Sequence, residues 1–476
     1  MPKLNKEAVI KKVLKKIVPK PAEARRLERL AQKALNAINK EAAKYNAYAI
    51  IAGSLTRNTW LPGKEEFDIF ILFPPDMPEG KMEKVGLEIG RRTIKKLRGK
   101  YVIEYAEHPY VCGQVKERHM DIVPCYEIES TDKLKSSVDR TPFHVRYIEK
   151  KLPLELSNEV RLLKQFCRAH DVYGADAKTE GFSGYVCELL TIKYGSFLNV
   201  LKAAASWHAG QIIDIEKFYR KEDHIDVQKK FKGQPLIIID PTDAKRNTAA
   251  SVSPRSFQIL RSAGRKFLDS SSEKMFFAEK RKPLKLGELK KLQKDRETEI
   301  IIVKFRPPKV VPDILWPQLR RFAERLEAIL KENEFVVLRK DVYTNEKDLA
   351  TVLLEMESCV LPAVRKHVGP SIFDEDGSKN FIKKYKPRAI NGPFVEGEFW
   401  VVELKRKFRT AKEKLDDSLK DPLKILRAKG IPSHIAKQIA KKYMLATDLK
   451  KILALTKKDK NFGIFLREYF EKESLV

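Results

Sequence analysis

Cysteine is scarce in this sequence and shows no pattern of a ligand set. The 476 residues include five cysteines, which are scattered along the chain and form no C-x-x-C pair. Disulfide-stapled folds carry even numbers of closely spaced cysteines, and structural zinc sites use paired cysteine or histidine ligands. The sequence therefore argues against both a disulfide framework and a structural zinc site.

Long apolar runs are missing as well. No stretch of 18 or more apolar residues occurs, and the lysine-dotted N-terminal segment lacks the layout of a secretory signal. Apolar residues still make up 43% of the chain, which is enough to build a packed core. We therefore expect a soluble, cytoplasmic protein without a membrane partner, with a length typical of about three domains.

Acidic residues are too few to balance the basic ones. The chain has 65 Asp and Glu against 95 Lys and Arg, so its formal net charge is +30. Such a surplus indicates a polyanionic partner, with nucleic acid ahead of an acidic membrane surface. Charge alone is equally compatible with an RNA-binding enzyme and with a catalytically silent RNA-binding scaffold.

Hydrophobic periodicity predicts an α+β head at the start of the chain. Apolar residues at helical spacing predict helices over 22–46 and 80–98. Strands are predicted at 47–53, 101–106 and 119–128, the last two joined by a turn near Gly113. Such an alternation of helices and strands is typical of an α+β or α/β fold.

The later part of the chain predicts a helical neck followed by a mixed body. Helical patterns dominate 141–258, with one strand at 236–240, and the charged, Pro/Gly-punctuated stretch 270–298 is typical of a domain boundary. A strand-helix-strand-strand pattern at 299–358 suggests a small RNA-binding platform, and the end of the chain is mostly lysine-rich helix. We therefore predict three domains, with a head over 1–140, a neck over 141–258 and a body with a tail over 259–476.

Carboxylates interrupt a segment that otherwise has the apolar pattern of a buried strand, "EEFDIFIL" (65–72). Side chains alternate on a strand, so Glu66 and Asp68 share one face while Phe67 and Ile69 share the other. Ionised carboxylates rarely enter a core unpaired, because their desolvation is costly. Two explanations stay open: a half-exposed edge strand, or a cation bound on the acidic face.

A third acid and a glycine turn favour the cation. Asp121 repeats the acid-apolar pattern in "MDIV" (120–123), and three acids meeting on neighbouring strands would call for Mg²⁺. Gly53-Ser54 ends the preceding strand, where glycine allows a phosphate to approach the backbone and serine adds a donor. Arg57 follows and is placed to pair with the same phosphates.

These motifs resemble those of a known superfamily. Gly-Ser, eleven residues, then Glu-x-Asp with an acid on a later strand resembles the DNA polymerase beta-type nucleotidyltransferases. The longer string "GSLTRNTWLPGKEEFDIFILFP" is similar to the archaeal, class I CCA-adding enzymes, which are tRNA nucleotidyltransferases. Later segments agree in order: "VDRTPFHVRYI", "LLKQFCRAHDVYGAD", "GFSGYVCELL", "DPTDAKRNTAAS" and "GPFVEGEFWVVE". The resemblance implies an α+β fold with a polymerase beta-like palm, a helical neck, and an α/β RNA-binding body with a helical tail.

The resemblance also assigns roles to individual residues. It implies that the catalytic, metal-binding acids are Glu66, Asp68 and Asp121. It implies that Ser54 and Arg57 bind the phosphates of the nucleotide. It implies that the triphosphate and sugar are bound by His144, Lys164 and Tyr173. The base would be read by Arg246, with Asn247 beside it. Leu55-Thr56 departs from the pattern, because relatives often carry an aromatic followed by a small residue there.

Taken singly, several of these residues have ordinary structural explanations. His144 is compatible with a helix-capping histidine, Lys164 with a solvated charge, Tyr173 with a surface aromatic and Arg246 with a generic phosphate contact. The segment "GFSGYVCELL" (181–190) predicts a tight helix entry that packs in the core. These readings stay open beside the assigned roles.

The implied reaction is template-independent addition or repair of the 3′-terminal CCA of tRNA. CTP and ATP would be used in a single site with two Mg²⁺ ions, and pyrophosphate would be released. The basic body and tail would hold the acceptor stem of the tRNA. The alternative is a poly(A) polymerase or another terminal RNA nucleotidyltransferase, which would share the three acids. The oligomeric state stays open, with a homodimer among the candidates.

Overall fold

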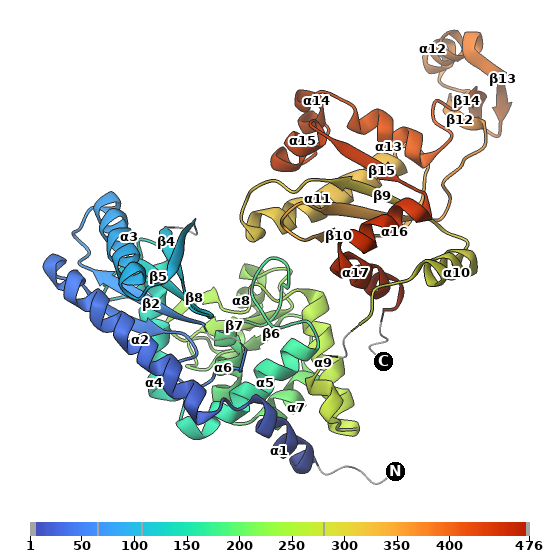
Figure 1. Ribbon diagram of the computed structural model, residues 1–476. Helices are drawn as coiled ribbons and strands as arrows, with labels where there is room; N and C mark the ends of the chain where they lie inside the picture. The colour runs from blue at the N-terminus through green and yellow to red at the C-terminus, as the bar shows by residue number, and fades with distance from the viewer. Residues whose placement is uncertain (1–5, 64–65, 106–107, 279–280, 473–476) are drawn as a thin grey trace. The chain divides into compact units, whose positions relative to one another are not determined.

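The protein, described here by a computed structural model, divides into two compact units near residue 279 (Figure 1). This division falls inside the stretch 270–298 that the sequence marks as a boundary. The proposed limits at 140/141 and 258/259 stay predictions, and helix α9 (Pro254–Asp269) runs across the second of them. The structure describes residues 6–63, 66–105, 108–278 and 281–472.

A five-stranded mixed sheet forms the head of the first unit. Its strand order is β1-β2-β5-β4-β3, with β2 and β5 parallel and the other neighbours antiparallel. The strands are β1 (Tyr48–Ala52), β2 (Glu66–Phe73), β3 (Lys100–Tyr105), β4 (Pro109–Val115) and β5 (Arg118–Tyr126). Because β2 lies between β1 and β5, the edge-strand explanation of its carboxylates is wrong.

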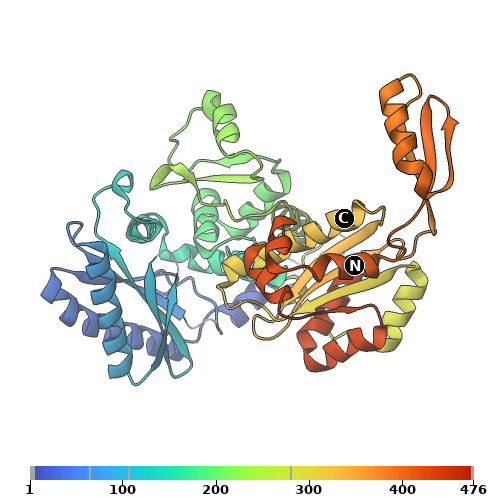
Figure 2. The same cartoon turned by 90° about the horizontal axis from the view of Figure 1, so that it is seen from above.

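Two helices cover one face of this sheet, α2 (Pro21–Ala42) and α3 (Glu79–Lys96) (Figures 1 and 2). Phe67 and Ile69 are fully buried against them, as the alternation in β2 predicts. The turn predicted near Gly113 is wrong, because Gly113 lies inside β4. A Cβ at this position would lie 2.3 Å from Ile94 Cδ1, so the glycine lets α3 pack onto the strand.

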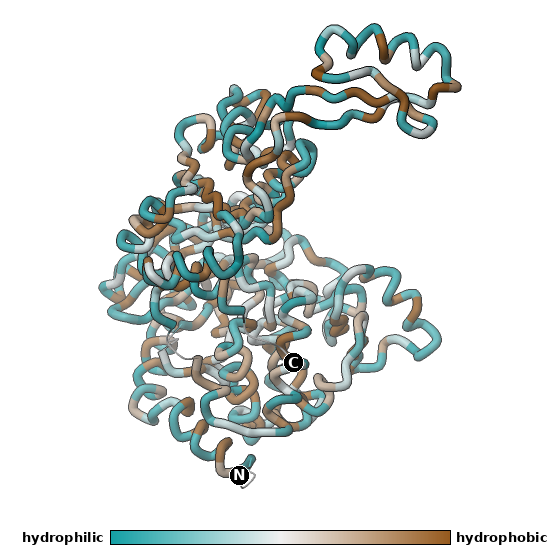
Figure 3. The backbone as a smooth tube through the Cα atoms, turned by 90° about the vertical axis from the view of Figure 1, so that its right-hand side faces the viewer, coloured by the Kyte–Doolittle hydropathy of each residue, from teal (hydrophilic) through white to brown (hydrophobic). Residues whose placement is uncertain are grey.

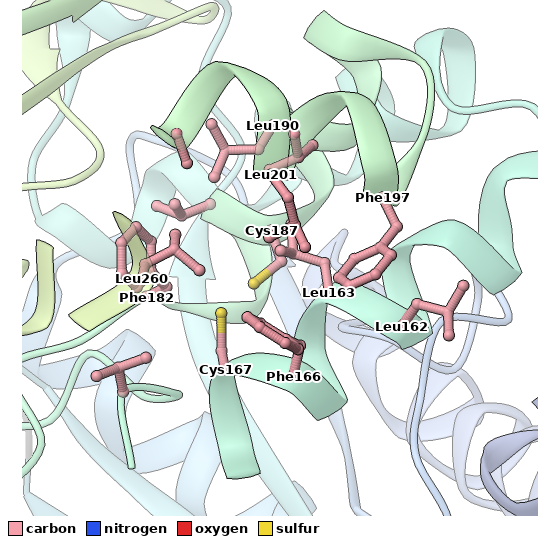
Figure 4. Close-up of a cluster of buried hydrophobic side chains, with 14 of the residues drawn as sticks. Leu162, Leu163, Phe166, Cys167, Phe182, Cys187, Leu190, Phe197, Leu201 and Leu260 are labelled. Atoms are coloured by element: carbon pink, nitrogen blue, oxygen red, sulfur yellow. The ribbon is translucent and has the colours of Figure 1, made fainter. Parts of the chain in front are cut away.

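The neck is a cluster of helices around an apolar core (Figure 4). The rings of Phe166, Phe197 and Phe276 pack with centroids 5.4–5.5 Å apart, and the sulfurs of Cys167 and Cys187 face one another. Gly181 lets the segment before α6 pair closely with the backbone at 172–174, because a Cβ there would lie 2.1 Å from the Val172 carbonyl oxygen. The helices are α1 (Lys6–Ile17), α4 (Thr141–Lys151), α5 (Ser157–Ala169), α6 (Gly184–Tyr194), α7 (Phe197–Ser206) and α9.

A small sheet completes the neck. Its strands are β6 (Gln211–Ile213), β7 (Leu236–Asp240) and β8 (Asp243–Asn247), with α8 (His224–Lys230) packed beside them through Val227. The predicted strand at 236–240 is confirmed, whereas β6 and β8 were not predicted. The fully buried β7 ends on an acid, Asp240, which brings a carboxylate to the edge of the core.

The second unit contains a four-stranded sheet of order β10-β11-β9-β15, and its first three strands confirm the predicted platform pattern. They are β9 (Glu299–Phe305), β10 (Val337–Thr344) and β11 (Ala350–Met356), with helix α11 (Pro312–Lys331) between the first two. Strand β15 (Tyr443–Ala446) was not predicted. The other helices are α10 (Leu286–Arg296), α13 (Ala411–Leu419), α14 (Leu423–Ala428), α15 (Ser433–Ile439), α16 (Leu449–Lys458) and α17 (Lys460–Phe470).

An arm projects from the rest of the second unit (Figures 2 and 3). It is a three-stranded sheet of order β12-β14-β13 with one helix, α12 (Glu375–Tyr385), packed on it through Phe381, Val402 and Leu404. The strands are β12 (Val364–Ser371), β13 (Ala389–Glu396) and β14 (Phe399–Lys405). Among the described residues, no helix combines the length and apolarity needed to cross a membrane.

Candidate active site

The three predicted acids lie on one face of the head sheet. In the parallel pairing of β2 with β5, Asp68 stands opposite Asp121, and Glu66 stands opposite His119. Paired residues of neighbouring strands point to the same side of a sheet, so all three carboxylates emerge on the face away from α2 and α3. The predicted convergence of the acids on adjacent strands is therefore confirmed.

The environment of Asp121 favours a cation beside it. Burial raises the pKa of Asp121 above its ordinary value, and the neighbouring Glu66 carboxylate raises it further. A hydrogen bond from the Cys112 thiol, on the paired position of β4, works in the opposite direction. Clustered carboxylate oxygens are the ligands that hard divalent cations prefer. The donor set therefore fits a divalent metal.

A second set of potential ligands lies elsewhere in the head. Glu79 and Glu83 in the first turns of α3 meet His108, which precedes β4, with ligand atoms within 4.8 Å of one another. His108 Nδ1 lies 3.0 Å from Glu83 Oε1 and 3.5 Å from Glu79 Oε1. One buried imidazole thus links both carboxylates, and Glu79 and Glu83 follow the Phe73 end of β2, which is remote from Asp68.

The turn after β1 runs directly against the acids. Gly53 has a φ of +83°, and a Cβ there would lie 3.1 Å from Asp68 Oδ2. Arg57 Nε donates to the Gly53 carbonyl at 3.0 Å, and the Thr59 N–H donates to the Ser54 carbonyl at 3.0 Å. These bonds hold Ser54 and Arg57 in one compact turn beside Asp68. Leu55, which departs from the family pattern, packs into the head core.

Behind this turn lies a buried ionic cluster around Glu188 of α6. Its Oε2 lies 2.8 Å from Arg57 Nη1, and its Oε1 lies 3.0 Å from Lys164 Nζ. Burial alone would raise the pKa of Glu188, but the charges of Lys164 and Arg57 hold it below its ordinary value. Lys164 is only 2% exposed, so its interpretation as a solvated charge is wrong.

The sequence interpretation missed Glu188, although it stands in the quoted segment "GFSGYVCELL". The sequence feature that could have revealed Glu188 is its place as an ionisable residue in an otherwise apolar helix. Its neighbours on α6 that are buried are Val186, Cys187, Leu189 and Leu190. A carboxylate in such a run needs cationic partners. Those partners lie far away in the sequence, on the turn after β1 and on α5.

Tyr173 and Lys164 meet at the start of α6. A Cβ on Gly184 would lie 3.3 Å from Tyr173 Oη and 3.5 Å from Lys164 Nζ, so the glycine keeps this corner open. Burial raises the pKa of Tyr173, and Glu66 is among the charges that raise it further. Tyr173 is therefore within electrostatic reach of the acidic face, and not a surface aromatic.

His144 and Arg246 form a separate cluster around Asp240. His144 Nε2 lies 2.8 Å from Asp240 Oδ2, and Arg246 Nη1 donates to the same oxygen at 2.7 Å. Burial would favour the neutral acid, but His144 and Arg246 hold the pKa of Asp240 well below its ordinary value. The structure thus groups His144 with Arg246, whereas the sequence placed it with Lys164 and Tyr173.

This second cluster lines a cavity of about 880 Å³ in the first unit. His144, stacked on Tyr185 at 4.2 Å, and Arg246 face it, as do Ser183 of the α6 cap and Asn247. The Asn247 side chain bonds the Ile238 N–H, the Ala249 N–H and the Leu236 carbonyl. Asn247 therefore shapes the wall of the cavity through the backbone.

Comparison with known proteins identifies the family. Three family models match in order: a nucleotidyltransferase domain at residues 32–144, the second domain of tRNA nucleotidyltransferase at 158–277, and the C-terminal domain of the CCA-adding enzyme at 296–448. The CCA-adding enzyme of Methanosarcina acetivorans is 35% identical over 464 residues, which cover 96% of this chain and 97% of the relative. This chain belongs to the CCA-adding enzymes. A relative from Methanoregula boonei is 37% identical over 393 residues, covering 83% of this chain and 82% of its own.

Membership of the CCA-adding enzymes confirms the resemblance to the archaeal enzymes and the polymerase beta-like α+β fold. It also establishes template-independent CCA addition to tRNA as the activity of this family member and excludes a catalytically silent scaffold. Nucleotidyltransferases use a divalent metal, which the acids of β2 and β5 fit. The roles of individual residues stay predictions at this point.

Asp240→Asn is expected to destabilise the enzyme in a pH-dependent way. Because the native pKa of Asp240 lies below its unfolded value of about 3.9, its carboxylate stabilises the fold above that pH, and the contribution is lost as the pH falls. Melting temperatures should therefore differ most near pH 7, and the difference should shrink progressively as the pH falls below about 4. Asp132→Asn, which removes an exposed partner of Lys245, is the control. A difference in melting temperature that does not change with pH would contradict a stabilising role of the Asp240 charge.

Proposed function

We propose that this CCA-adding enzyme uses CTP and ATP in one site, with Mg²⁺ held by Glu66, Asp68 and Asp121. The observation that carries the proposal is the register of β2 with β5, which sets Asp68 opposite Asp121 beside the Gly53 turn. Glu66, Asp68 and Asp121 would hold Mg²⁺, which would supply positive charge at the transferring phosphoryl group and lower the pKa of the attacking tRNA hydroxyl. Three carboxylates from rigid strands suit two such ions.

The residues beside the acids would bind the triphosphate. Ser54 adds a hydroxyl donor in the turn that touches Asp68, and Arg57 and Lys164 bring two cations to the same corner. Tyr173 adds a phenol next to Lys164 at the open start of α6. Fixed donors in a partly dry site stabilise the charge that moves onto the leaving pyrophosphate.

The cavity around His144 and Arg246 would receive the sugar and base. Asp240 accepts from both side chains with one oxygen, so it fixes their orientation toward the cavity. The Arg246 side chain keeps 38% of its surface exposed, which leaves guanidinium donors for the acceptor edge of a base. A protein group of this kind can select C or A without a nucleic-acid template.

A basic groove at the root of the arm would bind the tRNA backbone. Its volume is about 670 Å³, and its basic lining residues are Arg365, Lys384, Arg388, Lys405, Arg406 and Lys407. Tyr385 and Phe408 lie under these cations, with the Arg388 guanidinium 4.6 Å from the Tyr385 ring. A concave cationic surface with aromatic faces suits RNA phosphates and bases.

Asp68→Ala and Asp121→Ala should each abolish nucleotide addition, because either change removes an oxygen ligand of the metal. Binding of tRNA should stay close to that of the wild type, since the basic groove lies in the other unit. Single-turnover addition and tRNA affinity would be measured side by side. Asp76→Ala, an exposed acid after the same strand β2, is the matched control and should stay active. Substantial addition by Asp68→Ala would show that these acids are not the ligands.

A substrate test separates this proposal from a poly(A) polymerase-like activity. Given a tRNA that lacks CCA, the enzyme should incorporate two C from CTP before one A from ATP. With ATP alone it should leave that tRNA unextended, because the A position follows the second C. Extension of generic RNA by repeated addition of A from ATP would contradict the proposal. Products would be read at single-nucleotide resolution.

Charge reversal in the groove should weaken tRNA binding through lost phosphate contacts. In the double variant Lys384→Glu/Arg388→Glu, the Kd for tRNA should rise and the slope of log Kd against log salt should fall by about 1 to 2. Lys379→Glu, on the same helix α12 but outside the groove, is the control. An unchanged salt slope in the double variant would mean that the groove does not contact tRNA.

A further inference from the structure

Glu188 is a buried carboxylate that the proposed chemistry does not use directly. It is 1% exposed, lies on α6 of the neck, and contacts Arg57, Lys164 and Thr59. Its partners include both cations proposed to bind the triphosphate. Arg57 and Lys164 both pair with this one carboxylate, each through a different oxygen. Glu188 is therefore the shared partner of the phosphate-binding pair.

The contacts of Glu188 close into a rigid cluster. Thr59 Oγ1 donates to Glu188 Oε1 at 2.7 Å and accepts from Lys164 Nζ at 3.0 Å, while Lys164 also donates to Glu188. Thr59 is fully buried, which shields these bonds from bulk solvent. Each member thus fixes the position of the other two.

The cluster is connected to the metal-binding acids through Arg57. One end of its guanidinium meets Glu188 Oε2, and Nε donates to the Gly53 carbonyl. Gly53 in turn lies close to Asp68, since a Cβ at this glycine would be 3.1 Å from Asp68 Oδ2. A shift of Glu188 would therefore move the Arg57 guanidinium and the turn that carries Ser54.

The charges of the cluster do not balance. Two cations share one carboxylate, which leaves an excess positive charge in a buried place next to the turn. Without the carboxylate, two like charges would face each other with little solvent, and each would tend to move apart or lose its proton. A phosphate chain needs both cations in fixed positions to gain from them.

We infer that Glu188 is a positioning residue for the incoming triphosphate, which holds Arg57 and Lys164 in place before the nucleotide binds. This inference rests on the proposed function, because it takes both cations as phosphate ligands. Glu188 acts through them and does not contact the substrate. Substitution of Glu188 should therefore weaken binding through the β- and γ-phosphates and leave binding through the base and sugar unchanged.

A purely structural salt bridge makes a different prediction. It would join the neck to the head, and its loss would weaken the binding of all ligands and lower the thermal stability. Asp139 provides the matched control, because it is fully buried in the same unit and accepts backbone bonds from Tyr126, Lys135 and Ser136. Asp139→Asn should lower stability without separating triphosphate from monophosphate affinity.

The experiment compares affinities of the full-length enzyme for CTP and CMP. Glu188→Gln should raise the Kd for CTP about tenfold or more, and change the Kd for CMP less than about twofold. Thr59→Val keeps the shape of the side chain but loses two hydrogen bonds, so it should also raise the Kd for CTP more than the Kd for CMP, by a smaller factor. This second variant tests the inference if Glu188→Gln folds poorly. Equal weakening of CTP and CMP, or an unchanged CTP affinity, overturns the inference.

Lys164→Met separates failure of this inference from failure of the proposed function. If Lys164→Met retains wild-type CTP affinity, Lys164 is not a phosphate ligand, and the proposed function fails at that residue. If Lys164→Met weakens CTP but Glu188→Gln does not, the inference alone fails. In the Lys164→Met background, Glu188→Gln should have a smaller effect on CTP than in the wild type, since one of its two partners is already gone.

Discussion

The parallel pairing of β2 with β5 is the constraint on which the rest of the first unit depends. It brings Asp121 next to Asp68 although the chain passes through α3, β3 and β4 between them. The same register buries Phe67 and Ile69 against α2 and α3. A slip of one residue would turn the acids toward the core and the apolar side chains toward solvent. Packing of the head core therefore also fixes the acidic face.

Two buried carboxylates organise the cations around that face. Glu188 holds Arg57 and Lys164 beside the turn after β1, and Asp240 holds His144 and Arg246 along the cavity wall. Each carboxylate has the cationic partners that a buried charge requires. The proposed phosphate and base sites are thus built the same way, from an anion in the neck that fixes two basic side chains.

The sequence was sufficient for the parts of the site that follow local alternation. The faces of Glu66, Asp68, Phe67 and Ile69 follow from the period of a strand, and Asp121 repeats the same pattern. Strand β4 was not predicted, because Pro109 and Gly113 are weak strand formers and the strand depends on the fit of Gly113 to Ile94. The arm was not predicted either, since its packing depends on contacts such as Gly369 with Phe381.

The grouping of charged side chains could not be read from the sequence. Glu188 lies far along the chain from Arg57 and Thr59, and Asp240 lies far from His144, so neither group leaves a local pattern. Only the fold shows that Lys164 is buried and that His144 belongs with Arg246. Burial and ion pairing between distant segments are tertiary properties, which composition and periodicity do not encode.

The central claim is that the acids of β2 and β5 hold the divalent metal. Anomalous diffraction from crystals of the enzyme soaked with Mn²⁺ and CTP tests it most directly. Anomalous peaks are expected within bonding distance of the Asp68 and Asp121 carboxylates, and they should be lost in Asp121→Asn. Peaks only beside Glu79, Glu83 and His108, with none at Asp68, would contradict it.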